Sequence, residues 1–391
     1  MSRASASRFQ VRATLPVLMV TAFAVATGYG IALPRLPALL SDLAGAGGEA
    51  WRSRHVGGIT AVYFGAALVA APIWGRLSDR LGRRPIMALG ALGFATAFVA
   101  SELVDGLPEL YLARGLDGAF SAAVAPTALA YLADRWSDPD ARARRFAWLN
   151  ASVLSGYLAG PLIGEAVAPV GPLAPYALPA LTAALGALLL AGVEPVHPKA
   201  AATGAAGRGR FGARALLLAL SAVAAGSAVA QEIAVAVPFG PDDAGRTSAS
   251  LLLSFCGAVM FLTQVIIFSG RNSAARAVRL LRPLLIALAA GLAVTPLASG
   301  FWPLALVIAV VAAAGAALNV LASYLTSRLQ RGAQGAGLGL QYAAVSAGQL
   351  LAALGAGVSQ AAEAPVALWT TAFLALVLAA GWKRARLGAD A

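Results

Sequence analysis

Twelve apolar segments, each about the length of a membrane-spanning helix, follow one another along this chain of 391 residues. A helix needs about 20 apolar residues to cross the hydrocarbon core of a bilayer. The segments lie near residues 14–36, 56–74, 84–103, 108–133, 146–168, 173–194, 215–238, 249–269, 283–299, 302–326, 334–358 and 362–382. Lipid offers backbone groups no hydrogen-bonding partner, so the spans must be helical, and unbroken apolar runs of this length exclude a β-barrel. The sequence therefore predicts an all-α integral membrane protein with twelve transmembrane helices.

Composition and charge agree with a membrane protein and exclude several other classes. Hydrophobic residues make up 59% of the chain and charged residues 12%, which is unlike a soluble domain. The net charge of +12 is explained by membrane topology and by attraction to anionic lipids, so we expect no nucleic-acid partner. Cys256 is the single cysteine, and His55 and His197 are isolated. A disulfide within the chain and a metal site are therefore not expected.

The positions of the basic residues predict how the chain is oriented. Most of the 29 Lys and Arg residues fall at the two termini and in alternate loops, and basic residues collect on the cytoplasmic side of a membrane protein. We therefore expect a multi-pass protein of the cytoplasmic (inner) membrane with both termini in the cytoplasm.

A stretch rich in proline, small residues and arginine predicts the domain organisation. Residues 195–214 form the longest such stretch between spans, and they divide the helices six and six. We expect two pseudo-symmetric six-helix bundles, 1–194 and 215–391, joined by a cytoplasmic linker. Repeated halves with a substrate site near the bilayer midplane are the usual architecture of secondary transporters.

The turn between the second and third spans carries the densest charge of the chain, with one aspartate among four arginines. It resembles the signature loop of the major facilitator superfamily in Gly75, Asp79, Arg80, Gly82, Arg83 and Arg84. Gly75 and Asp79 are four residues apart and share one helix face, so a neighbouring helix could approach the glycine and meet the carboxylate. The resemblance implies a latch to the start of the eleventh span that stabilises an outward-facing state. The alternative is a basic turn that serves only topology.

The fourth span extends the resemblance through Leu110, Arg114, Asp117 and Gly118, with Asp117 where the family commonly has glutamine. A charge inside a span costs at least ~2.5 kcal/mol, so Arg114 needs a partner or water. Asp117 lies three residues on and could pair with it. We interpret the pair as part of a proton-coupling path. A static ion pair, or an Asp117 solvated near the outer surface, remains the alternative.

The fifth span carries a glycine pattern made of Gly156, Gly160, Pro161 and Gly164. It resembles the motif of the drug:proton antiporters, the tetracycline and multidrug exporter branch, although Ala147 and Glu165 depart from that motif. The resemblance implies a dry contact with the eighth span. Generic packing of small residues is the alternative.

The candidate coupling acids and cavity residues lie within the spans. Glu232 is the main candidate for the coupling acid because apolar residues flank it for several turns. A hydrogen-bonded structural carboxylate near the outer end of the span is the alternative for Glu232, and Glu165 is the runner-up as coupling acid. The polar or aromatic candidates for the substrate cavity are Tyr29, Gln231, Gln264, Asn319, Gln341 and Tyr342.

These patterns predict a transporter that works as a monomer and is not an enzyme. It would export a small, amphipathic or drug-like organic molecule in exchange for protons by alternating access. The sequence has no nucleotide-binding loop, so the proton gradient is the expected energy source and no cofactor is expected. A proton-coupled or facilitative importer of a small metabolite is the alternative.

Overall fold

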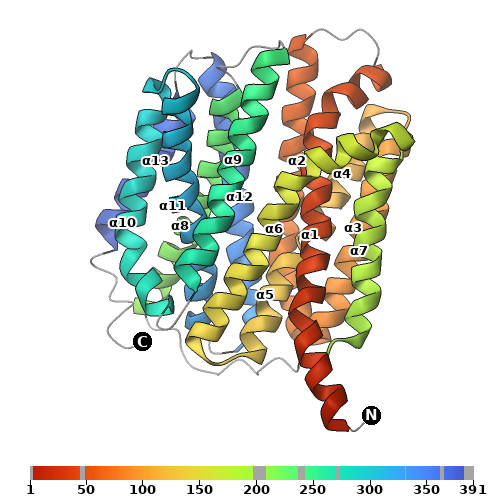
Figure 1. The fold of residues 1–391 in the computed structure, drawn as a ribbon, viewed down its shortest axis with the longest axis vertical. Helices are drawn as coiled ribbons and strands as arrows, with labels where there is room; N and C mark the ends of the chain where they lie inside the picture. Colours follow the sequence, from red (N-terminus) through yellow and green to blue (C-terminus); the bar gives the residue numbers. More distant parts are fainter. Residues whose placement is uncertain are drawn as a thin grey trace. The chain divides into compact units, whose positions relative to one another are not determined.

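The computed structural model describes residues 3–44, 49–196, 208–236, 243–269, 273–330, 332–361 and 365–382. Within these ranges the chain folds into helices joined by short turns (Figure 1). The α-helices are α1 (Arg3–Ala44), α2 (Glu49–Leu81), α3 (Arg83–Leu103), α4 (Leu107–Ser121), α5 (Val124–Arg135), α6 (Pro139–Val167), α7 (Ala174–Leu189), α8 (Arg208–Ala236), α9 (Asp243–Phe268), α10 (Ser273–Val294), α11 (Phe301–Leu329), α12 (Gln334–Ala361) and α13 (Val366–Gly381). Short 3-10 turns are η1 (Ala168–Val170), η2 (Leu190–Gly192) and η3 (Thr295–Leu297).

The apolar lengths of these helices confirm the predicted fold class. In the described part, 10 helical segments are long and apolar enough to cross a membrane, and two shorter apolar helices, Ser254–Phe268 and Val366–Gly381, stand where the two other spans were expected. Large apolar side chains such as Trp302 and Leu181 are mostly exposed, as expected for helices that face lipid rather than water.

One predicted span is divided into two helices. The span Leu107–Arg135 consists of α4 and α5 with a break at Ala122 and Ala123. Pro126 stands in the first turn of α5 and has no N–H to donate to the carbonyl of Ala122, so the regular hydrogen-bond ladder is interrupted there. Ala123 instead donates its N–H to the carbonyl of Phe120.

The chain forms two compact units. Unit 1 comprises Met1–Ser137, Trp148–Ala201 and Arg331–Ala343, and unit 2 comprises Asp138–Ala147, Ala202–Gln330 and Ala344–Ala391. Unit 1 thus includes the start of α12 from the second half of the sequence, and unit 2 includes the start of α6 from the first half. Most of the expected linker, residues 197–207, lies outside the described residues.

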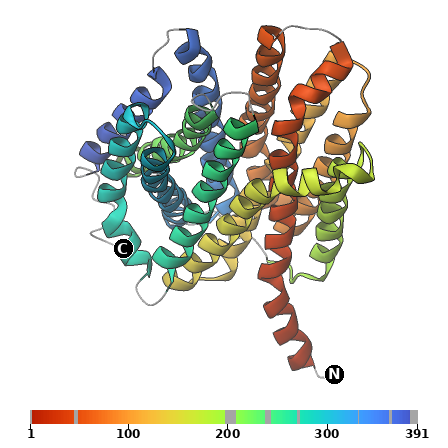
Figure 2. The ribbon, with the colours of Figure 1, turned by 45° about the horizontal axis from the view of Figure 1, so that its top comes forward.

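Each unit has its own packed interior. In unit 1, Phe98 stacks on Phe94 with 5.3 Å between the ring centroids, and it also contacts Tyr176 of α7. In unit 2, Leu252 of α9 packs against Leu304 and Ile308 of α11. Also in unit 2, α10 packs against both α11 and α13 (Figures 1 and 2).

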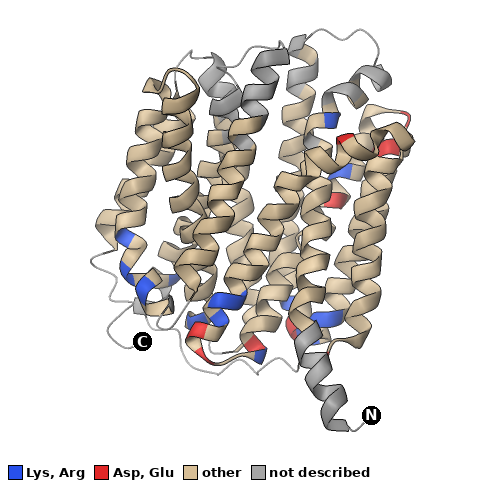
Figure 3. Cartoon of the chain, in the orientation of Figure 1, with Lys and Arg blue, Asp and Glu red and all other residues tan. Residues whose placement is uncertain are grey.

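Basic residues of unit 1 gather at the end of its helices that carries the arginine-rich turn, and further basic residues lie along the spans nearer the other end (Figure 3). These residues include the arginines of the turn at the end of α2 and Arg135 at the end of α5. The concentration at one end is what the predicted cytoplasmic side requires, and the orientation itself stays a prediction.

Candidate functional site

The arginine-rich turn is a sharp reversal between α2 and α3. Gly82 has φ = 98° and separates the two helices, a left-handed conformation that glycine adopts without the steric cost of a Cβ. Its N–H donates to the carbonyl of Ser78 at 3.1 Å. The glycine of the motif therefore lets two spans reverse direction over one residue.

The carboxylate of Asp79, near the end of α2, lies against the start of α12, and both helix ends belong to unit 1. Its Oδ1 accepts a hydrogen bond from the N–H of Gly335 at 3.0 Å, and its Oδ2 accepts one from Ala336 at 2.7 Å. The first amides of a helix have no partner within the helix and attract negative charge. The structure therefore places Asp79 where the latch prediction requires it, and the role of the contact in transport stays a prediction.

Gly75 allows the two helices to come this close. A methyl group built at Gly75 would overlap the carbonyl oxygen of Gly335, and one built at Gly339 would lie 2.5 Å from the carbonyl oxygen of Ala71. Glycines on both helices thus let the backbones touch, as in close helix packing within membranes.

Arg83 is fully buried, and it binds the carboxylates of Asp79 and Asp134. Its guanidinium lies 2.6 Å from Asp79 and 2.8 Å from Asp134, and it donates to the hydroxyl of Ser78 at 2.7 Å. A buried guanidinium is tolerated only where charge and hydrogen bonds are satisfied. Asp134 and Ser78 were not among the predicted residues: Ser78 adjoins Asp79 in sequence, whereas no local pattern links Asp134, 51 residues from Arg83, to the turn.

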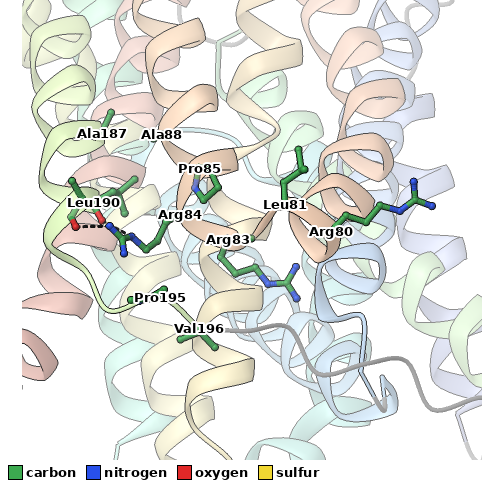
Figure 4. Close-up of a pocket in the computed structure, with 12 residues that line it drawn as sticks. Arg80, Leu81, Arg83, Arg84, Pro85, Ala88, Ala187, Leu190, Pro195 and Val196 are labelled. Carbon is green, nitrogen blue, oxygen red and sulfur yellow. Dashed lines mark hydrogen bonds between the residues drawn. The ribbon is translucent and has the colours of Figure 1, made fainter.

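Two residues of the motif lie away from this ion cluster. Arg80 is exposed. Arg84 donates from Nε to the carbonyl of Leu190 at 2.8 Å and from Nη2 to the carbonyl of Ala191 (Figure 4). Arg84 therefore ties the start of α3 to the end of α7, which is a different contact from the latch.

The second charged cluster lies inside the span formed by α4 and α5. Arg114 and Asp117 are 2% and 1% exposed and form an ion pair. The carboxylate also accepts a hydrogen bond from the hydroxyl of Ser121 at 3.1 Å. The expected pairing is thus present, and neither of these two residues is solvated.

Tyr63 of α2 covers the arginine. The guanidinium carbon of Arg114 lies 5.0 Å from the centre of the Tyr63 ring, within the range of a cation–π interaction. Gly118 makes this contact possible, because a methyl group there would overlap the carbonyl oxygen of Tyr63.

Tyr63 also belongs to an aromatic cluster that includes one predicted cavity residue. The ring of Tyr29 on α1 lies 5.2 Å from Tyr63, 5.5 Å from Phe64 and 5.3 Å from Tyr157 of α6. These separations are typical of favourable aromatic pairs. Three helices therefore bring aromatic side chains together beside the buried ion pair.

Two further candidates, Tyr342 and Gln341, lie next to each other on α12. Tyr342 packs against the small buried residues Ala67, Ala71 and Ala122 of unit 1. Gln341, its neighbour, is 2% exposed. Both candidates therefore lie on the part of α12 that belongs to unit 1.

The glycine pattern of α6 packs against α1. Methyl groups built at Gly156 and Gly160 would lie 2.5 Å from the carbonyl oxygen of Phe23 and 2.8 Å from that of Thr27, and one at Gly164 would lie 3.3 Å from Ile31. The atoms nearest to all three glycines come from α1, whereas the resemblance implied a contact with the span near 249–269. Pro161 lies inside α6 within the same run.

The remaining candidates are spread over unit 2 and the end of α6. Gln231 is buried and donates to the carbonyl of Ile308 at 3.3 Å. Gln264 is fully buried, and neither atom of its amide has a hydrogen-bond partner in the described part of the chain. Asn319 is half-buried on α11 and Glu165 is exposed near the end of α6. The side chain of Glu232 lies outside the described residues.

Unit 2 contains a contact that resembles the one made by Asp79. Asp140, at the start of α6, accepts a hydrogen bond from the N–H of Ala274 at the start of α10 at 3.0 Å. Arg142 donates to the hydroxyl of Ser327 at 3.1 Å. Neither residue was predicted, although an acid followed by arginines at a helix start is a visible signal for such a contact.

The predictions also missed Tyr63 and Ser121 as parts of the buried cluster. Ser121 follows Asp117 by four residues on a helical span, so its contact could have been found from spacing alone. Tyr63 comes from another helix, and nothing in its own sequence surroundings indicates that it faces Arg114.

Comparison with known proteins places the chain among membrane transporters. Residues 18–353 match the Major Facilitator Superfamily. A stretch of 156 residues is 33% identical to the class B tetracycline resistance protein of Escherichia coli, covering 40% of this chain and 38% of that protein. A stretch of 154 residues is 28% identical to the quinolone resistance protein NorA of Staphylococcus aureus, covering 39% and 38%. The aligned region thus spans less than half of each of these relatives.

The fold has close structural counterparts. The human organic anion transporter MFSD10 (TETRAN) has a TM-score of 0.75 at 18% identity, over 94% of this chain and 98% of that chain. The proton:xylose symporter XylE has a TM-score of 0.74 at 16% identity, over 95% of each chain.

Proposed function

Because the chain belongs to the major facilitator superfamily, we propose that it exports a small amphipathic organic molecule in exchange for protons by alternating access. Resistance proteins for tetracycline and quinolones are among its relatives, which makes these two compound classes the first substrates to test. The tyrosine-rich cluster around Tyr29 and Tyr63 favours molecules with a flat apolar body, because aromatic rings pack well against such a surface.

The ion pair of Arg114 and Asp117 is the observation that carries this proposal. It is buried within a span, where charged residues are rare and mark ion or proton pathways. When Asp117 takes up a proton, its charge attraction for Arg114 is lost, and the guanidinium becomes available to a polar group of the substrate. When Asp117 releases the proton, it recaptures Arg114. Proton and substrate would thus compete for one arginine, which is the requirement for exchange.

The turn at the end of α2 has a separate role in this cycle. The hydrogen bonds from Gly335 and Ala336 to Asp79 hold the start of α12 against α2. Alternating access requires such a contact to form in one state and to open in another. The buried Arg83 lies 2.6 Å from the Asp79 carboxylate and keeps it oriented while the contact is made.

Transport into inverted membrane vesicles tests the proposal. Tetracycline, a quinolone and a cationic dye would be offered with and without an imposed proton gradient. We expect the Asp117→Asn variant to lose gradient-driven accumulation about tenfold or more, because the amide cannot carry the proton. Asp105→Asn is the matched control, since Asp105 is exposed in the loop before α4.

Two outcomes would contradict the proposal. Gradient-driven accumulation that persists in Asp117→Asn would remove the role of this acid and leave Glu232 as the next candidate. Accumulation confined to right-side-out vesicles would indicate an importer instead of an exporter.

A further inference from the structure

A pocket of 430 Å³ opens beside the arginine-rich turn, and Arg83 of the ion cluster contributes to its lining. It lies within unit 1, between the turn that joins α2 to α3 and the end of α7 (Figure 4). The spans of α2, α3 and α7 end or begin at Leu81, Arg83 and Gly192. Because three spans have their ends there, the pocket lies at the level where the hydrocarbon core meets the headgroups.

One wall of the pocket is basic. Arg80, Arg83 and Arg84 contribute to its lining, and none of the described residues that line it is acidic. The charge of Arg83 is offset by its contacts with Asp79 and Asp134, and Figure 4 shows the Arg80 side chain directed away from Leu190. Arg84 is therefore the guanidinium that faces the pocket.

Arg84 is held in place and still has donors to offer. Its contacts to the carbonyls of Leu190 and Ala191 use Nε and Nη2, whereas a guanidinium has five N–H donors in a rigid fork. These two contacts fix the orientation of the fork at the rim of the pocket. A guanidinium held in this way is suited to bind a phosphate.

The rest of the lining forms an apolar wall, which continues into the exposed apolar surface of the same helices. Leu81, Pro85, Ala88 and Ala187 contribute to it. Above it on the same helices, Leu89 of α3 and Leu188 of α7 are 47% and 72% exposed. A ligand that fits both walls has an anionic head and a long apolar chain.

We propose that this pocket binds an anionic phospholipid, with Arg84 contacting the headgroup phosphate and one acyl chain lying along α3 and α7. Basic pockets between transmembrane helices at the cytoplasmic surface bind anionic headgroups of this kind. The lipid would join the start of α3 to the end of α7, one residue away from the buried Arg83. A free phosphate would satisfy the arginine and leave the apolar wall uncovered.

Binding of phosphatidylglycerol to the delipidated full-length protein tests the proposal, with phosphatidylcholine of the same chain length for comparison. Arg84→Gln removes the charge and keeps an amide donor. Loss of one basic contact at a membrane surface corresponds to about 1 kcal/mol, so we expect phosphatidylglycerol affinity to fall about fivefold. Arg76→Gln is the matched control, because Arg76 is exposed near the end of α2, on the other side of the turn from Arg84, and does not line the pocket.

A second variant tests the apolar wall independently of charge. Ala88→Trp fills the pocket from a half-exposed position of α3 and leaves every arginine in place. We expect it to weaken phosphatidylglycerol binding as well, and inorganic phosphate at millimolar concentration not to compete.

Three results would overturn the proposal. Equal losses in Arg76→Gln and Arg84→Gln would indicate a general basic surface. Competition by inorganic phosphate together with full binding in Ala88→Trp would indicate a free-phosphate site. Equal binding of phosphatidylcholine and phosphatidylglycerol would show that the anionic charge of the lipid is not recognised.

Discussion

Arg114 is a charged residue buried inside a span, so its charge must be compensated by neighbouring groups. A guanidinium with 2% exposure inside a span is stable only because a carboxylate three residues away and an aromatic ring from another helix compensate it. Loss of one partner leaves an uncompensated charge in a medium that solvates it poorly.

The first prediction concerns the pair itself. Arg114→Leu and Asp117→Leu should each lower the free energy of unfolding by about 3–5 kcal/mol, because each leaves a buried charge without its partner. The double variant should lose clearly less free energy of unfolding than the two single variants lose together. It should not transport. Thermal unfolding in detergent and vesicle transport measure the two effects. A double variant whose loss equals that sum would show that the residues do not interact.

The second prediction concerns Tyr63. Tyr63→Leu removes the ring over Arg114 and should lower the free energy of unfolding by roughly 2 kcal/mol, the size of a desolvated cation–π interaction. Tyr63→Phe keeps the ring over Arg114 and loses only the hydroxyl group, so the free energy of unfolding should fall less than in Tyr63→Leu. The apparent melting temperature should therefore be highest for the wild type, lower for Tyr63→Phe and lowest for Tyr63→Leu. Equal losses in the two variants would assign the effect to the hydroxyl group.

Glycines allow close backbone contact between α2 and α12. The Gly75 Cα faces backbone atoms of Gly335 and Gly339, so van der Waals contact between main chains replaces side-chain interdigitation. The carboxylate of Asp79 reaches the amides of α12 only because this approach is so close.

Two glycine-to-alanine substitutions on α2 distinguish the effect of close helix packing from the effect of helix propensity. Gly75→Ala places a methyl group against the Gly335 carbonyl and should lower the free energy of unfolding by about 1–3 kcal/mol through overpacking. Gly65→Ala on the same helix meets nothing within 4 Å and should raise it by up to ~1 kcal/mol, since alanine is the better helix former. Thermal unfolding of both variants measures the difference. A Gly75→Ala variant as stable as Gly65→Ala would show that the two backbones are not in contact.

At the scale of the molecule, each unit contains one helix start from the other half of the sequence, and each of these is fixed by a carboxylate. Asp79 accepts from the first amides of α12 within unit 1, and Asp140 at the start of α6 accepts from the start of α10 within unit 2. The same physical device, an acid at the unpaired amides of a helix end, thus occurs in both units.

Hydrogen exchange tests the two contacts against each other. Asp79→Asn should accelerate exchange of the amides at 335 and 336, since their acceptor is weakened. It should leave the amide at 274 unchanged. Asp140→Asn should do the reverse, so each variant is the control for the other. Faster exchange at both places in either variant would mean that the contacts open together.

The sequence by itself determined the helical spans, the reversing turn and the side chains that meet within one helix. Arg114 and Asp117 are three residues apart on α4, and the helical period places such a pair on one face. The apolar lengths fixed the membrane fold because lipid permits few alternatives to a helix.

Only the tertiary structure decided which faces meet. The ring of Tyr63 over Arg114, the contact of Asp134 with Arg83 and that of Arg84 with Leu190 all join residues far apart in sequence. The glycines of α6 meet α1, although their spacing is equally suited to another partner. The helical period fixes neighbours along one helix, whereas the partner of each face depends on packing among all the helices, which no local pattern contains.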